Sequence, residues 1–152
     1  EERLRTRTQF LADLAVALGG YVSEKIVFGD ITTGASNDLK VASELSYDLV
    51  TKYGMSEKLG PMAFSQGEEM FLGRDLGGKK YSEKVAAKID EEVNSLIQTA
   101  YRTAQKIIKS RRKVLDAIAK TLTEKEVLEH EEFYGILKGF NLKPLATSSF
   151  AA

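Results

Sequence analysis

The sequence predicts an all-α fold: a mostly helical bundle with one long helix and a glycine-rich central loop. Three observations predict it. Apolar residues recur every three or four positions along most of the 152-residue chain, which is the spacing of an amphipathic helix. The longest such stretch, residues 82–110, contains neither Gly nor Pro. Glycines stand where these stretches end, as they do at helix C-termini.

Two short helices are expected first. Residues 4–18 place their large apolar side chains on one face, and the double glycine Gly19-Gly20 should end this helix in a left-handed conformation. Residues 21–28 form the second helix, and Gly29 closes it.

A third helix should begin near Ser36 and stop at Gly54, because one apolar stripe runs between them. Residues 54–81 then carry six glycines and are expected to form a loop. Two short apolar pieces in this loop, 62–64 and 70–72, could pair as a small hairpin.

The strongest pattern predicts one helix from Ser82 to about Ser110, with Ser82 as its N-cap. Another helix should cover residues 114–122. The run from Thr123 to Glu126 has the form of a capping box, which predicts a new helical turn there.

A last short helix carries Phe133, Ile136 and Leu137 and should end at Gly139. The tail 144–152 is expected to be disordered. No linker composition marks a boundary, so residues 1–152 are expected to form one domain.

Composition excludes several function classes. The 22 basic and 22 acidic residues cancel, which argues against a nucleic-acid partner. No cysteine is present, so thiolate metal sites and thiol nucleophiles are excluded. No apolar run reaches the roughly 20 residues that a membrane-spanning helix needs. The chain opens without Met, which suggests a piece of a longer protein, although a processed mature chain would look the same.

Two motif-like segments have simple explanations. His130 is the only histidine, and beside three glutamates it is best explained as a solvated residue at a helix start. Catalytic zinc needs about three protein ligands, which His130 cannot supply alone. The segment Leu76-Gly77-Gly78-Lys79-Lys80 lacks the strand and the Ser or Thr of a phosphate-binding loop.

Asp38 is the most informative acid in the chain. It follows Thr32-Thr33-Gly34-Ala35-Ser36-Asn37, at the predicted start of the third helix. An acid in a first helical turn is stabilised by the free N–H groups and the helix dipole, and this alone would explain it. Ser36 suits the capping role, however, which would leave the Asp38 carboxylate free to bind a metal. The residues by themselves leave both interpretations open.

The order of motifs resembles the peptidase domain of FtsH-type membrane-anchored, ATP-dependent zinc proteases, over nearly the whole chain. The most specific segments are ITTGASNDLKVASEL (31–45) and YGMSEKLGP (53–61). Further matching segments are Gly19-Gly20, Glu24, Phe28-Gly29, Phe71 to Asp75, Tyr81 to Glu83, Ile89 to Val93, Ala100-Tyr101, and Leu122 with Glu126 and Leu128.

The resemblance implies that Asp38 is the third zinc ligand. The two histidines and the general-base glutamate of the family lie in an H-E-x-x-H helix, which is expected upstream of this chain, so no catalytic residue is assigned here. An ATPase module that binds ATP and Mg, and a membrane anchor, are implied further upstream. The implied parent is a hexamer that degrades membrane and soluble proteins in quality control, with its peptidase domain in the cytoplasm or an organelle matrix.

The chain departs from the family pattern at a few positions. Tyr21 stands where the family usually has Arg, Val22-Ser23 where small residues are usual, and Ser43 where Thr is common. Two hypotheses follow. Either the chain belongs to a working protease, or it is a helical oligomerisation scaffold of an inactive relative. The retained Asp38 favours the protease, and Tyr21 favours the scaffold.

Overall fold

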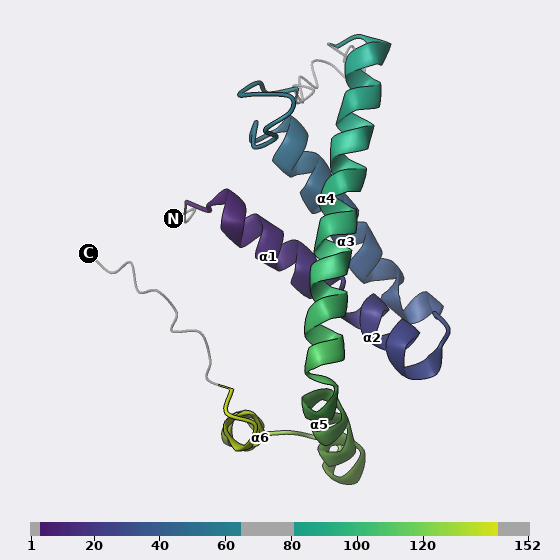
Figure 1. Ribbon diagram of the computed structural model, residues 1–152, viewed down its shortest axis with the longest axis vertical. Coiled ribbons are helices and arrows are strands. Elements are labelled where there is room, and N and C mark those ends of the chain that lie inside the picture. The colour runs from purple at the N-terminus through teal and green to yellow at the C-terminus, as the bar shows by residue number, and fades with distance from the viewer. Residues whose placement is uncertain (1–3, 65–80, 143–152) are drawn as a thin grey trace, which may run out of the picture. The chain divides into compact units, whose positions relative to one another are not determined.

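The computed structural model describes residues 4–64 and 81–142, and within these ranges all regular structure is helical (Figure 1). The elements are α1 (Arg7–Ala17), α2 (Gly19–Phe28), the 3₁₀ turn η1 (Thr33–Ala35), α3 (Ser36–Thr51), α4 (Glu83–Ser110), α5 (Arg112–Lys125) and α6 (His130–Gly139). The predicted all-α class is confirmed. None of the helices in the described ranges is both long and apolar enough to span a membrane.

The chain divides into two compact units, residues Glu1–Ile107 and Ile108–Ala152. The first unit has a core to which α1, α3 and α4 all contribute. Leu14 of α1 and Leu49 of α3 are fully buried, and Ile89 of α4 is 1% exposed. The remaining buried members of this core are Phe10, Leu18, Ala42, Val50, Leu96 and Ala100. These positions are the apolar stripes that the sequence predicts.

The junction of α1 and α2 differs from the prediction. The double glycine Gly19-Gly20 does not end α1 in a left-handed turn. Helix α1 ends at Ala17, and both glycines are the first residues of α2, without a positive φ. Leu18 joins the helices directly: its N–H donates to the Leu14 carbonyl at 3.1 Å, and its own carbonyl accepts from Val22 N at 3.0 Å. Hydrogen bonding thus passes from one helix to the next with no need for a left-handed residue.

The long helix α4 is confirmed at 28 residues. Ser82 caps it as predicted, because its Oγ accepts from Val85 N at 3.3 Å. Gly29 also behaves as predicted, and closes α2 with φ 71°. Of the central loop, residues 54–64 are described. The partner piece of the predicted hairpin, 70–72, lies outside the described residues, as does the tail 144–152.

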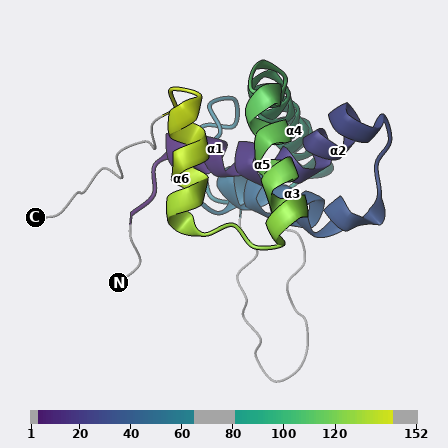
Figure 2. The same cartoon turned by 90° about the horizontal axis from the view of Figure 1, so that it is seen from below.

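In the second unit, a short segment connects α5 to α6 (Figure 2). The capping box predicted at Thr123 is wrong. Helix α5 continues to Lys125, and the Thr123 hydroxyl donates to the Ala119 carbonyl within that helix at 2.8 Å. The helix ends at Glu126 instead, which adopts a left-handed conformation with φ 63°. The last helix ends at Gly139, as predicted.

Candidate functional site

A 3₁₀ turn leads the chain into α3 and determines where Asp38 lies. Thr32 precedes this turn, and its Oγ1 accepts a hydrogen bond from Gly34 N at 3.0 Å. Ala35 is buried beneath the turn. The predicted capping role of Ser36 is wrong: Ser36 is the first residue of α3, and no side chain caps this helix. Because η1 runs directly into α3, the capping oxygen is needed earlier, and Thr32 supplies it.

Glu24 of α2 binds Thr32, the residue that precedes η1. Its Oε2 accepts from Thr32 N at 2.9 Å, and each of its oxygens lies 3.2 Å from Thr32 Oγ1. One carboxylate therefore holds both the backbone and the side chain of the residue that caps η1. The sequence marked Glu24 only as part of a matching segment. No local sequence pattern predicts the contact between Glu24 and Thr32, because it depends on how the chain turns between α2 and η1.

Asp38 lies in the first turn of α3, as predicted, and its side chain is half-buried. Within residues 4–64 and 81–142, no hydrogen bond or ion pair involves this carboxylate. It lies against the backbone of α2: a Cβ atom built at Gly20 would be 2.7 Å from Asp38 Oδ2 and 3.9 Å from its Cγ. The carboxylate thus lies next to α2 without a polar partner in the described part of the chain.

A pocket of about 310 Å³ adjoins this place along the chain, since Tyr21 follows Gly20 and Leu39 follows Asp38. The rings of Tyr21 and Tyr101 meet edge-on, with centroids 6.2 Å apart. Lys25 Nζ lies 5.8 Å from the centre of the Tyr101 ring. The pocket is lined by Leu18, Tyr21, Lys25, Leu39, Ile97, Gln98 and Tyr101. Tyr21 therefore packs against Tyr101 of α4.

The Gly-Met-Ser-Glu-Lys-Leu-Gly segment (residues 54–60) forms a second polar cluster with α4. Ser56 Oγ donates to Glu92 Oε2 of α4 at 2.8 Å, and accepts from Leu59 N at 3.1 Å. Lys58 Nζ forms an ion pair with the other Glu92 oxygen, at 2.7 Å. Burial raises the pKa of Glu92, but the Lys58 ammonium and the Ser56 hydroxyl more than offset this, so that the pKa lies below its ordinary value.

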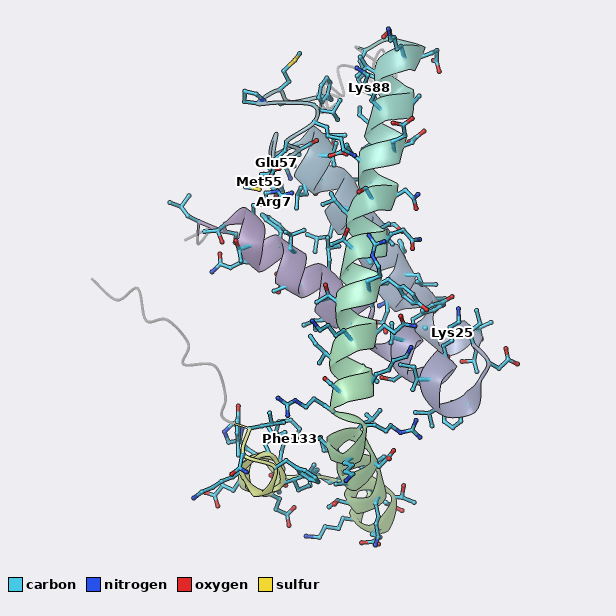
Figure 3. The ribbon with its side chains drawn as sticks, in the orientation of Figure 1. Arg7, Lys25, Met55, Glu57, Lys88 and Phe133 are labelled. Atoms are coloured by element: carbon cyan, nitrogen blue, oxygen red, sulfur yellow. The ribbon has the colours of Figure 1, made fainter. Side chains whose placement is uncertain are left out.

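Arg7 of α1 extends this cluster. Its Nε donates to the Met55 carbonyl at 3.0 Å, and its Nη1 lies 3.4 Å from Glu57 Oε1 (Figure 3). The segment therefore ties α1 and α4 together. Since Glu92 is held as a paired carboxylate, it has the properties of a structural anchor and not those of a general base.

The structure does not assemble a complete metal site in the described ranges: no group of three or more His, Cys, Asp or Glu side chains gathers there. His130 is the exposed first residue of α6 in the second unit, as predicted, and its ring contacts that of Tyr134 at a centroid distance of 4.5 Å. Asp38, the one predicted site residue, therefore lies in the described ranges without other metal-ligating side chains gathered around it.

Comparisons with known proteins agree with the motifs. Residues 1–136 match the model of peptidase family M41. Three similar relatives are named ATP-dependent zinc metalloprotease FtsH. That of Caldicellulosiruptor bescii is 48% identical over 84% of this chain, that of Chloroflexus aggregans 47% over 93%, and that of Thermotoga maritima 44% over 90%.

These alignments cover 21%, 22% and 23% of the length of the respective relatives, so the chain corresponds to less than a quarter of each. The family model covers the first unit and reaches into the second. The match to the family model, over residues 1–136, includes most of the chain. The chain belongs to peptidase family M41.

Proposed function

We propose that this chain is part of the proteolytic domain of an ATP-dependent zinc metalloendopeptidase, and that Asp38 supplies one of the protein ligands of the zinc. The observation that carries the proposal is the Asp38 carboxylate itself: it is half-buried, lies against Gly20 of α2, and has no polar partner among the described residues. A carboxylate that is partly shielded from water and accepts no hydrogen bond is free to bind a metal ion.

The donor chemistry of Asp38 fits zinc. Zinc in catalytic sites takes His nitrogens and carboxylate oxygens from about three protein ligands, and leaves a position for water. When bound, zinc would polarise a peptide carbonyl and lower the pKa of that water. The other ligands and the general base would come from an H-E-x-x-H helix, which this chain does not contain.

This chain's own residues would fix where the carboxylate stands. Asp38 belongs to the first turn of α3, and the preceding turn is held by Thr32 and Glu24. A ligand on a helix whose start is fixed in this way can be oriented without a large loss of conformational entropy on binding. An ATPase module with ATP and Mg, a hexamer, a membrane anchor and a role in protein quality control are proposed for the longer protein from the family resemblance.

The test uses full-length protein with Asp38→Asn and Asp38→Ala. We expect both to lose zinc and casein hydrolysis, and to keep ATP hydrolysis and the melting temperature of the zinc-free protein. Asp48→Asn is the matched control, because Asp48 is also a half-buried acid on α3. It should retain zinc and proteolysis.

Two outcomes would contradict the proposal. Retained proteolysis with a lowered melting temperature in Asp38→Ala would make Asp38 a helix-start residue only. A full-length protein with neither bound zinc nor proteolysis, but with an intact hexamer, would support the alternative of a helical scaffold.

A further inference from the structure

The two adjacent glycines at the start of α2 have very different surroundings. A Cβ atom at Gly20 would meet Asp38 Oδ2 at 2.7 Å, closer than real Cβ contacts come. A Cβ atom at Gly19 would meet nothing within 4 Å. Neither residue has the positive φ that would require glycine for its backbone conformation. The absence of a side chain at Gly20 therefore leaves room for one atom, Asp38 Oδ2.

That oxygen belongs to a side chain that can move. Asp38 has two rotatable bonds, and no described residue holds its carboxylate by a hydrogen bond. A methyl group at residue 20 would therefore turn the carboxylate aside and leave the helices in place. The contact constrains the direction of the carboxylate more than the stability of the fold.

We propose that Gly20 is a positioning residue for Asp38: its missing side chain leaves the space in which the carboxylate stands when it binds the metal. This inference rests on the proposed function, in which Asp38 is a zinc ligand. A zinc–oxygen bond of about 2.0–2.2 Å tolerates little displacement of its ligand. Groups that orient a ligand typically change metal affinity by about 10- to 100-fold when they are altered.

The experiment compares Gly20→Ala with Gly19→Ala in the full-length protein. Zinc affinity is measured by competition with a chromophoric chelator, and the melting temperature is measured on the zinc-free protein. Both variants place Ala in the first turn of α2, where it favours the helix, so both should melt at the wild-type temperature or above. Zinc affinity should fall about 10- to 100-fold in Gly20→Ala and stay at the wild-type value in Gly19→Ala.

Asp38→Asn separates this inference from the function on which it rests. If Asp38→Asn leaves zinc affinity unchanged, the proposed zinc site itself is wrong, and the role of Gly20 is overturned with it. If Asp38→Asn loses zinc while Gly20→Ala binds it as tightly as Gly19→Ala does, the inference about Gly20 alone is overturned.

A destabilised Gly20→Ala protein would still give an answer. Its melting temperature is then compared with that of the double variant Gly20→Ala with Asp38→Ala, in which the methyl group has no carboxylate to meet. Recovery of the melting temperature supports the contact between residues 20 and 38. No recovery means that residue 20 is needed for another reason, and it overturns the inference.

Discussion

The Ser56 hydroxyl offers the sharpest test of how the first unit is held together. In Ser56→Ala, the carboxylate of Glu92, which is 9% exposed, loses its hydrogen bond at 2.8 Å, and Leu59 N loses its acceptor at 3.1 Å. A hydrogen bond to a charged group contributes about 1.5–3 kcal/mol, and one between neutral groups about 0.5–1.5 kcal/mol. We therefore expect the free energy of unfolding to fall by about 2–4.5 kcal/mol.

This loss is measurable by urea or thermal unfolding. For a domain of this size, 1 kcal/mol corresponds to about 2–4 °C, so the melting temperature should fall by roughly 4–18 °C. Ser43→Ala is the control, because the exposed Ser43 hydroxyl donates only within its own helix, to the Leu39 carbonyl at 2.8 Å. That change should stay within about 0.5 kcal/mol. If the two variants unfold alike, the network around Glu92 does not stabilise the fold as argued.

The network around Glu92 should also make the free energy of unfolding depend on pH in the acid range. Because the pKa of folded Glu92 lies below its ordinary value of 4.5, the folded state binds this proton less readily than the unfolded state does. The associated stability is present above about pH 4.5 and is lost as the pH falls through the folded value. Ser56→Ala removes one of the groups that lower this pKa, so its stability should fall less steeply in acid.

Two more predictions concern other parts of the molecule. The Tyr47 hydroxyl lies 3.0 Å from that of Tyr81, and this hydrogen bond, with burial and the nearby charge of Asp90, raises the pKa of Tyr47 from 10.0 to about 12. Because folding favours the protonated form of Tyr47, this hydrogen bond stabilises the fold below about pH 10, and the stabilisation is lost as the pH rises toward 12. In Tyr47→Phe the free energy of unfolding should therefore fall less steeply over that range. An unchanged slope would contradict the raised pKa of Tyr47. The 152-residue chain alone should bind zinc no more tightly than a surface carboxylate does and should not cleave casein, because Asp38 cannot replace three ligands; one tightly bound zinc per chain at micromolar concentration would refute this.

The sequence was a good guide wherever a structural feature depends on near neighbours. The 28-residue helix α4 follows from an unbroken apolar stripe and from Ser82, both of which are local. Gly29 has one function, which is to adopt a left-handed conformation, and its position after an apolar run reveals it.

Features that depend on distant parts of the chain could not be predicted in this way. A glycine can end a helix or make room for a neighbour, and only the packing of α2 on α3 shows that Gly20 does the second. Ser36 and Thr32 are both residue types that cap helices, and the 3₁₀ turn between them decides which one caps. The importance of Asp38 came from the family resemblance, since its pattern alone is that of any acid at a helix start.

The direct junction at Leu18 has a consequence for changes in chain length. Leu18 is 1% exposed, and it is both the C-cap of α1 and the N-cap of α2. Because Leu18 is anchored in the core, it determines which face of α2 each following residue occupies. An α-helix turns by about 100° per residue. One residue inserted after Leu18 would therefore rotate the faces of α2 by more than a quarter turn, and would carry Gly20 away from Asp38 while the apolar composition stayed the same. The position of Gly20 relative to Asp38 therefore depends on the number of residues that separate Gly20 from Leu18, and a single insertion or deletion at this junction should be tolerated far less well than a substitution such as Gly19→Ala.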